Sequence, residues 1–513
     1  MFSRVNSMGL FGVDSYMVGV EVDCGQGLPR IDIVGLPDAA VNESKNRVRS
    51  AIKNSGFSFP QSRVTINLSP ADIRKEGSSY DLPLAIGILA SAEEVRSEKL
   101  SDYLIIGELS LDGSLQPIKG ALPIAISARA QGFKGFILPK QNAKEAAVVN
   151  NLHVYGVENI KEVIEFFNGE RELEPTIVHT REEFFQHQDN YPYDFADVKG
   201  QESVKRALEV AAAGGHNLIM IGSPGSGKSM MAKRLPSILP PLSLAESLET
   251  TKIHSVAGKL NKNDSLIATR PFRSPHHTIS QVAMVGGGSN PQPGEISLAH
   301  NGLLFLDELP EFNRSVLEVL RQPLEDRHIS ISRARYSLDY PASFMLVASM
   351  NPCPCGYYTH PTKPCVCNPG QVHRYLNRIS GPLLDRIDIQ IEIVPVPFEK
   401  MAEQKPGESS AVIRERVIKA RKIQEERFAN HPGIYCNAQM ESKLLQEYAV
   451  PDTQGLQLLR NAMSRLNLSA RAYDRILKVA RTIADLEGAS SIKPHHLAEA
   501  IGYRNLDREN WGG

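Results

Sequence analysis

The chain has 513 residues, 42% of them hydrophobic, and its 57 lysines and arginines nearly balance 58 acidic residues, for a formal net charge of −1. This length exceeds what a single hydrophobic core organises, so about three domains are expected. The balanced charge excludes a globally basic nucleic-acid coat, and any DNA contact must use a local basic stripe. No apolar run approaches the ~20 residues that cross a bilayer, and the N-terminus has no clear signal-peptide core. We therefore expect a cytoplasmic protein without membrane contact.

Residues 1–168 alternate between strand-like and helix-like patterns, which predicts a first domain of mixed α and β structure. The predicted strands are 16–22, 30–34, 63–68, 104–106 and 135–138, and the predicted helices are 39–55, 82–92 and 121–130.

Two motifs in this domain resemble the proteolytic domain of Lon proteases. The run Lys75-Glu76-Gly77-Ser78-Ser79 is similar to the Lon serine motif, and 107–118 is similar to the stretch that leads to the Lon catalytic lysine. The resemblance matches Ser79 to the nucleophile, but Leu122 stands where the lysine would be. A serine hydroxyl needs an adjacent base, and Lys119 is displaced by three residues. We therefore expect a Lon-like fold that is non-proteolytic and serves assembly or guides DNA.

A polar linker is predicted at 169–194, followed by an ATPase core at 195–396. Within this core, the apolar run 218–221 leads into a G-x-x-x-x-G-K-S motif and then a helical pattern, the arrangement of a phosphate-binding loop. Its glycines let backbone N–H groups point at a polyphosphate, and the helix N-terminus adds partial positive charge, so ATP binding is predicted. The predicted ATP-binding residues are Gly222, Ser223, Pro224, Gly225, Ser226, Gly227, Lys228 and Ser229.

Two predicted buried strands in the core end in polar residues. The strand after Gly302 ends in Asp307 and Glu308. Asp307 and the Ser229 hydroxyl are predicted to hold Mg²⁺, while Glu308 polarises the attacking water. The strand 344–350 ends at Asn351, whose amide can orient that water. His276 and His277, in the insert between the motifs, are better explained as loop histidines than as metal ligands.

Residues 328–344 alternate between apolar and polar side chains, and this alternation predicts a β-hairpin. Arg333 and Arg335 lie near its tip, where they would contact DNA phosphates without reading bases. A solvated hairpin that makes no DNA contact is an equally open alternative.

Four of the six cysteines fall in one polar loop as two C-x-C pairs. This density predicts a structural tetrahedral Zn²⁺ site that fastens a loop too polar to pack by itself. Free thiols are the alternative, because the pairs are tighter than the usual C-x-x-C. The four predicted ligands are Cys353, Cys355, Cys365 and Cys367.

Further arginines are predicted to act on the nucleotide. Arg386 is expected to reach the γ-phosphate held by a neighbouring subunit, and an Arg386–Asp388 structural pair is the alternative. Residues 397–513 predict a helical lid domain, in which Arg471 could close over the nucleotide. Two arginines of the same helix compete for that role, Arg475 and Arg481.

Together, these motifs resemble AAA+ ATPases, and nearly the whole chain is similar to the ComM/YifB family of magnesium-chelatase-like ATPases. The Lon-like domain and the segments 351–356 and 380–386 carry the second resemblance. It implies an α/β fold with a Lon-like α+β domain, a P-loop core with a parallel sheet and a helical lid. It also implies a homo-hexameric ring with ATP between subunits. The implied function is branch migration of DNA by a helicase in homologous recombination during natural transformation.

Two other functions stay open. One is a metal-insertion ATPase subunit of the magnesium-chelatase type, although no porphyrin-binding partner domain is fused to this chain. The other is an ATP-dependent protease, which would need a working base for Ser79.

Overall fold

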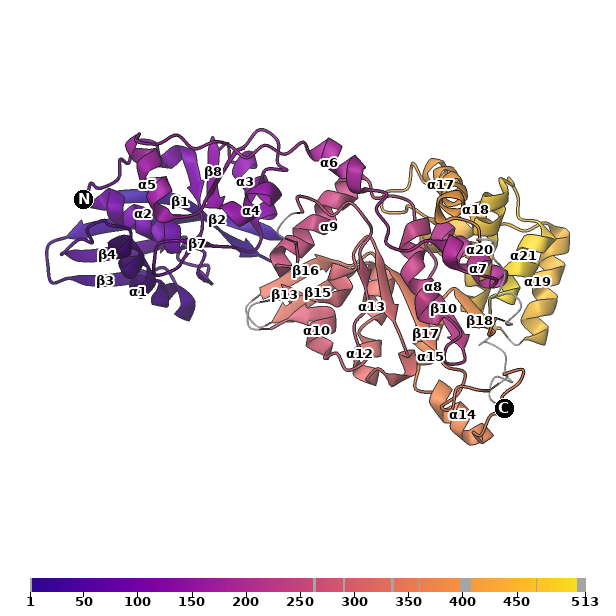
Figure 1. Ribbon diagram of the computed structural model, residues 1–513. Coiled ribbons are helices and arrows are strands. Elements are labelled where there is room, and N and C mark those ends of the chain that lie inside the picture. Colours follow the sequence, from indigo (N-terminus) through magenta and orange to yellow (C-terminus); the bar gives the residue numbers. More distant parts are fainter. Residues whose placement is uncertain are drawn as a thin grey trace. The chain divides into compact units, whose positions relative to one another are not determined.

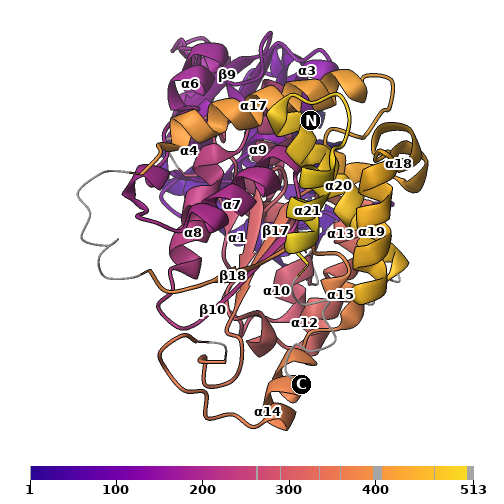
Figure 2. The same ribbon diagram turned by 90° about the vertical axis from the view of Figure 1, so that its right-hand side faces the viewer.

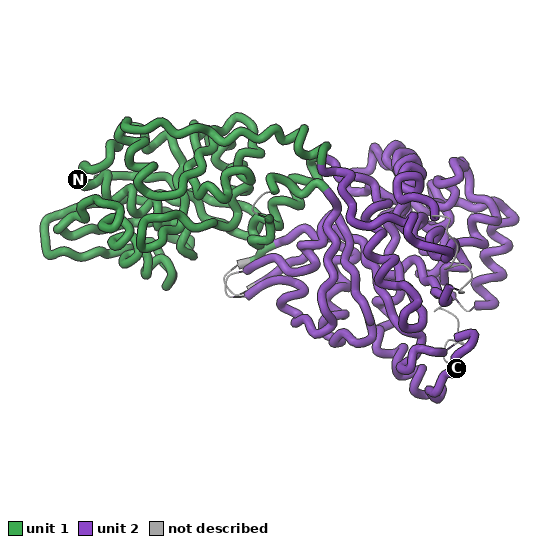
Figure 3. The backbone as a smooth tube through the Cα atoms, viewed as in Figure 1, with its two compact units in different colours: residues 1–186, 244–268, 334–338 green, residues 187–243, 269–333, 339–513 purple. Residues whose placement is uncertain are grey.

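The computed structural model describes residues 2–261, 264–288, 291–333, 336–358, 360–396, 407–466 and 468–504. The chain forms two compact units, each assembled from separated stretches of sequence (Figure 3). Unit 1 comprises residues 1–186, 244–268 and 334–338, and unit 2 comprises residues 187–243, 269–333 and 339–513.

A seven-stranded mixed sheet forms the framework of unit 1, in the order β3-β4-β2-β1-β5-β8-β9 (Figure 1). The long strands β1 (Phe2–Phe11) and β2 (Asp14–Gly25) pair antiparallel, and β2 pairs antiparallel with β4 (Arg63–Ser69). The remaining strands pair parallel with their neighbours: β3 (Arg30–Val34), β5 (Tyr103–Ile105), β8 (Gly135–Pro139) and β9 (His153–Val157). A separate short pair consists of β6 (Glu108–Leu109) and β7 (Leu115–Gln116).

Three helices of unit 1, α1 (Ala39–Asn54), α2 (Asp81–Ser91) and α3 (Ala121–Ala130), form where the sequence predicts them, whereas α4 (Lys140–Ala146) and α5 (Ile160–Asn168) lie where no helix was predicted. Side chains of β4 alternate, with Val64, Ile66 and Leu68 buried, as in a strand with one covered face. The wholly buried helix α2 packs on β1 and β2.

Helix α9 (Leu244–Ala257) packs in unit 1, although the sequence analysis placed it in the ATPase core 195–396. It lies against α3, where the Gly120 backbone N–H donates to the Ser255 carbonyl over 3.0 Å. The Ser255 hydroxyl also donates to the buried carboxyl of Glu145. The core boundary therefore differs from the prediction, because α9 satisfies its polar groups on α3 and α4.

The predicted linker 169–194 also contains ordered structure. Its helix α6 (Thr180–His187) buries Phe184, which is 2% exposed. The Thr180 hydroxyl donates to the Val148 carbonyl over 3.2 Å. This part of the segment is therefore packed rather than extended.

A five-stranded parallel sheet forms the centre of unit 2, in the order β11-β14-β17-β10-β18. Strands β10, β14 and β17 are buried in every residue, as expected when helices cover both faces of a parallel sheet. The bounds are β10 (Leu218–Gly222), β11 (Phe272–Arg273), β14 (Leu303–Leu306), β17 (Met345–Met350) and β18 (Ile389–Ile393).

The helices in and before this sheet are short, apart from α7. The helical stretch 314–326 is broken into α12 and α13, because Pro323 has no N–H to continue the helical hydrogen bonds. The bounds are α7 (Glu202–Gly214), α8 (Lys228–Arg234), α10 (Gln281–Val285), α11 (Glu295–Leu298), α12 (Arg314–Glu318), α13 (Arg321–Asp326), α14 (Pro369–Leu376) and α15 (Gly381–Leu384).

Two hairpin-like pairs accompany the sheet. One joins β12 (Gly286–Gly287) to β13 (Gln292–Pro293), and the other joins β15 (His328–Arg333) to β16 (Tyr336–Pro341). The second pair is the hairpin predicted over 328–344. Arg335 and the side chain of Arg333 lie outside the described residues.

The predicted helical lid shares one hydrophobic core with the sheet of unit 2. The lid helices are drawn in orange and yellow in Figure 2. Leu218 of β10 and Ile476 of α20 belong to that core, so the lid is part of the same compact unit. Its helices are α17 (Ser410–Arg427), α18 (Ser442–Tyr448), α19 (Thr453–Arg465), α20 (Ala470–Glu487) and α21 (Pro494–Gly502).

Across the described part of the chain, no helix combines the length and apolar character that a bilayer crossing requires.

Candidate nucleotide site

The predicted phosphate loop connects β10 to α8, as its motif requires. Gly225 and Gly227 have φ values of +79° and +93°, a backbone region that favours glycine. Ser223 and Ser226 are buried, and within the described residues their hydroxyls have no hydrogen-bond partner. The loop therefore carries two buried hydroxyls that are available to a ligand.

Lys228 begins α8 and its side chain turns back over the loop. Its Nζ donates to the carbonyls of Gly222 over 2.7 Å and Ser223 over 3.0 Å, and to Asn351 Oδ1 over 3.2 Å. Burial lowers the pKa of Lys228, and the nearby carboxylates of Asp307 and Glu308 partly oppose that shift. The structure thus brings two predicted site residues, Lys228 and Asn351, into contact.

Ser229 and Asp307 form the second contact of the site. The Ser229 hydroxyl donates to Asp307 Oδ2 over 2.8 Å, and the Ser349 hydroxyl donates to Asp307 Oδ1. Asp307 follows β14 directly and Ser349 lies in the adjacent strand β17, so neighbouring parallel strands position both groups. Ser349 was not predicted, because a serine within a strand pattern carries no distinguishing signal.

Glu308, the residue after Asp307, has an unusual backbone conformation. Its φ of 54° and ψ of 50° are left-handed, which costs a non-glycine residue about 1–3 kcal/mol. Its carboxylate is 55% exposed and lies 3.9 Å from Nδ1 of His277. The ring of His277 also lies 4.1 Å from that of His276, centroid to centroid. Sequence patterns do not link His277 to Glu308, because the two residues lie on separate segments.

The residues of the phosphate loop, together with Asp307, fit a nucleoside triphosphate with Mg²⁺. The serine hydroxyl and aspartate carboxylate are hard oxygen ligands of the kind that Mg²⁺ prefers. The unpartnered hydroxyls of the phosphate loop and the N-terminus of α8 suit an anionic ligand.

The two predicted arginines contact acidic side chains of unit 2. Arg386 is 12% exposed, and its guanidinium donates to Glu325 and to the Pro382 carbonyl, the latter over 2.6 Å. Arg471 is 69% exposed and donates to Asp385 Oδ2 over 2.8 Å. Neither contact includes the phosphate loop, so their predicted roles need a neighbouring subunit or a movement.

The Arg386–Asp388 pair, which was the alternative role for Arg386, does not form in the described part of the chain. Asp388 instead contacts His216 and Arg475. His216 Nδ1 lies 3.1 Å from Asp388 Oδ2, and Arg475 lies 3.0 Å from Asp388 Oδ1. Burial opposes ionisation of Asp388, but Arg475 and His216 prevail and hold its pKa below the usual range. His216 Nε2 lies 2.7 Å from the Thr482 hydroxyl of α20. This buried network, which sequence patterns did not indicate, fastens α20 to the sheet.

Arg481 is also occupied. It is buried, and it donates to Asp485 and to the carbonyls of Ala489 and Ser490. It therefore stabilises the end of α20.

The Lon-like residues of unit 1 have contacts within that unit. Leu122 is fully buried, and its backbone N–H donates to Glu145 over 3.0 Å. The stem of Lys119 lies against Gly258, where a Cβ atom would be 3.0 Å from the lysine Cε. The Ser79 carbonyl accepts from the Gly107 N–H over 2.8 Å. Leu122 and Lys119 are therefore engaged in packing.

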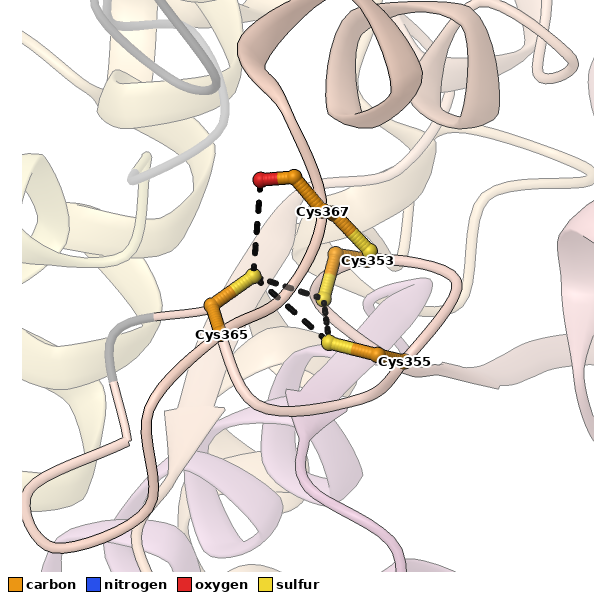
Figure 4. Close-up of side chains that lie close together, drawn as sticks. All are labelled: Cys353, Cys355, Cys365 and Cys367. Atoms are coloured by element: carbon orange, nitrogen blue, oxygen red, sulfur yellow. Dashed lines mark hydrogen bonds between the residues drawn. The ribbon is translucent and has the colours of Figure 1, made fainter.

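The four predicted zinc ligands converge in the loop between β17 and α14 (Figure 4). All four ligand atoms lie within 4.8 Å of one another.

Three stretches of the chain match known protein families. Residues 194–401 match the family described as magnesium chelatase, subunit ChlI, and residues 407–504 match the one described as its C-terminal part. Residues 20–142 match the family described as subunit ChlI of Mg-chelatase.

Full-length relatives extend this similarity. Competence protein ComM of Haemophilus influenzae is 44% identical over 506 residues, which cover 98% of this chain and 97% of that protein. The chain belongs to the ComM/YifB family of magnesium-chelatase-like AAA+ ATPases. YifB of Escherichia coli, a second family member, is 44% identical over 510 residues, covering 99% of this chain and 97% of its own length.

The N-terminal fold of this ComM/YifB chain is Lon-like. Lon protease 2 of Bacillus subtilis is 30% identical over 164 residues, which are 28% of each chain. With the parallel sheet of unit 2, this confirms the predicted fold class of a Lon-like α+β domain, an AAA+ core and a helical C-terminal part.

Proposed function

We propose that this ComM/YifB protein is an ATP-driven ring motor that moves branched or single-stranded DNA. The observation that carries the ATPase part is the paired contact of Lys228 with Asn351 and of Ser229 with Asp307. These contacts join the phosphate loop to the ends of two neighbouring strands, where a hydrolytic site needs its cation and its polar groups.

Each residue has a defined role in this proposal. Lys228 binds the β- and γ-phosphates, and Ser229 and Asp307 hold Mg²⁺, which would neutralise charge developing on the phosphates. Glu308 accepts a proton from the attacking water while Asn351 fixes that water by hydrogen bonding. Arg386 serves the γ-phosphate of the adjacent subunit, and Arg471 approaches it from the lid.

For Arg386 to bind the γ-phosphate of the adjacent subunit, its guanidinium must leave its present partner. Its guanidinium is bound to Glu325 within the same chain. Formation of a homo-hexamer would offer a phosphate in place of that carboxylate, and a phosphate also forms bidentate bonds with guanidinium. This exchange would couple hydrolysis to assembly of the ring.

The DNA part rests on two supports. One relative is named competence protein ComM, and competence is the uptake of DNA for natural transformation. Arg333 is the last residue of β15, and Arg335 directly precedes β16 in the sequence. Two arginines on a hairpin that projects into a ring pore would contact phosphates of any sequence. Branch migration during homologous recombination is the activity that best fits these supports.

Hydrolysis of ATP is measured without DNA, with single-stranded DNA and with a four-way junction, each at two salt concentrations. Stimulation by DNA that decreases at higher salt is expected, because phosphate contacts release counterions. Turnover that DNA leaves unchanged at both salts would refute the DNA motor while leaving the ATPase intact.

A metal-insertion motor is the second candidate, since three stretches of the chain match magnesium-chelatase families. It predicts ATP turnover that responds to a porphyrin-binding partner protein and not to DNA. An ATP-dependent protease is disfavoured because Leu122 is buried and Lys119 packs on Gly258.

A further inference from the structure

The loop between β17 and α14 has little apolar material to hold it in place. It covers 351–368, a length at which loops without regular structure are uncommon. Val366 is 82% exposed, whereas Cys353 is fully buried. Hydrophobic packing at Cys353 alone does not explain how this loop keeps its shape.

The four thiols of the loop supply the missing constraint. Sγ of Cys353 lies 3.3 Å from that of Cys355 and 3.7 Å from that of Cys365, and the latter two are 3.5 Å apart. Four sulfurs bound to one Zn²⁺ at about 2.3 Å would be about 3.8 Å apart in a tetrahedron. None of the four is in a disulfide. The sulfurs of Cys353, Cys355 and Cys365 therefore have nearly the spacing that a single ion imposes, and Sγ of Cys367 lies within 4.8 Å of each of them.

The surroundings favour bound thiolates. The Tyr358 backbone N–H donates to Sγ of Cys353 over 3.3 Å, a bond that stabilises negative charge on the sulfur. Two C-x-C pairs from opposite ends of the loop, Cys353 with Cys355 and Cys365 with Cys367, supply the ligands (Figure 4).

We propose that Cys353, Cys355, Cys365 and Cys367 bind one structural Zn²⁺. Tetrahedral sulfur sites select zinc or iron, and the short separations fit a single ion rather than a multi-iron cluster. With four protein ligands the ion has no open position, so its role is structural.

The same loop contacts the phosphate loop, which gives the metal a second consequence. Gly356 has a φ of +83°, and a Cβ atom there would lie only 2.5 Å from Cδ of Pro224. The Gly356 N–H donates to the Cys353 carbonyl over 3.0 Å, which ties that close approach to a metal ligand. We infer that Zn²⁺ holds the turn Cys353–Gly356 against Pro224 and so preorganises the phosphate loop. This second step rests on the proposed nucleotide site.

The metal is tested on the full chain purified without chelator, by elemental analysis. About one zinc per chain is expected, and Cys365→Ser should lose it while Cys24→Ser, outside the loop, keeps it. A folded wild-type protein without zinc, or one holding iron instead, would overturn the assignment. Because Cys365→Ser could fail to fold, the wild type is also exchanged with Co²⁺. Visible absorption typical of tetrahedral tetrathiolate cobalt is expected, and an octahedral spectrum would refute the site.

The coupling is tested separately by nucleotide binding. Wild-type protein stripped of zinc, and zinc-loaded Gly356→Ala, should both bind a fluorescent ATP analogue about 5- to 150-fold more weakly, the usual range for coupled sites. Gly370→Ala is the control, because a Cβ atom there meets only Asn368 Oδ1 at 3.6 Å. Unchanged affinity in both proteins would refute the coupling and leave the zinc site standing. Zinc-loaded wild type that binds no ATP would instead refute the proposed nucleotide site.

Discussion

The Ser229 hydroxyl donates a 2.8 Å hydrogen bond to Asp307 Oδ2, joining the first turn of α8 to the end of β14. Two motifs separated by 78 positions thereby become one pair of oxygen ligands. In the proposed function this pair would hold Mg²⁺ beside the phosphate loop.

Replacing Lys228 should weaken nucleotide binding. Charge-assisted hydrogen bonds contribute about 1.5–3 kcal/mol each, so Lys228→Ala should raise the dissociation constant of ATP at least about tenfold. Equilibrium titration with a fluorescent analogue measures this. Lys233→Ala, an exposed lysine of the same helix, is the matched control and should bind normally. Equal affinities for the two variants would exclude Lys228 from phosphate binding.

Replacing Glu308 should separate binding from hydrolysis. Glu308→Gln keeps the size of the side chain but loses its proton acceptor, so turnover should fall by about 10²- to 10⁴-fold with ATP affinity retained. Phosphate release and nucleotide titration on the same preparation give both quantities. Glu202→Gln, 78% exposed on α7, controls for loss of one carboxylate. Retained turnover in Glu308→Gln would assign the base to another residue.

The role of Arg386 across subunits is tested by mixing. Arg386→Ala should bind ATP but not hydrolyse it, because in the proposed function Arg386 serves the nucleotide of the adjacent subunit. Adding Lys228→Ala subunits, which retain Arg386, should restore part of the turnover. If no mixing ratio restores any turnover, Arg386 acts within its own chain, consistent with its contact to Glu325.

The hairpin arginines should affect coupling only. Arg333→Ala combined with Arg335→Ala is expected to leave basal ATPase unchanged and abolish its stimulation by DNA. Arg460→Ala with Arg465→Ala, two exposed arginines of α19, removes the same charge elsewhere. DNA stimulation that survives in the hairpin variant would remove the hairpin from the mechanism.

His216 should make stability depend on pH. Burial lowers the pKa of this imidazole despite its bond to Asp388, so it stays neutral when folded and gains a proton on unfolding below about pH 6.5. The unfolded state then binds more protons, and stability should fall as pH decreases from 7.5 to 5.5. His216→Gln should reduce this fall in melting temperature, whereas exposed His153→Gln should not. Identical pH profiles for wild type and His216→Gln would refute the account.

Sequence patterns predicted the local elements more fully than their association. The helical pattern predicted for the C-terminal part is confirmed, and its helix α20 begins at the cap residue Ser469 and ends before Gly488, which has left-handed backbone. The contact of Lys228 with Asn351 depends on the adjacency of β17 and β10, which the motifs do not specify. The packing of α9 on α3 could not be predicted, because the apolar pattern of α9 does not indicate which element it packs against.

The site residues that the sequence did not predict were missed for one physical reason. Ser349 contacts Asp307 and His277 contacts Glu308, in each case across a long separation in sequence. A single serine or histidine in a strand or loop does not indicate such a contact. The buried His216–Asp388 pair was missed because residues 172 positions apart show no pattern together. Such contacts are set by tertiary packing, which periodicity does not encode.

Residues 244–268 belong to unit 1 although the stretches before and after them belong to unit 2, and this limits where the gene can be divided. A fragment encoding only residues 195–504 would still contain α9 but would lack α3 and α4, leaving the buried Ser255 and its neighbours against water. An ATPase half exchanged between related genes must therefore bring an α9 whose surface fits the α3 and α4 of the recipient chain.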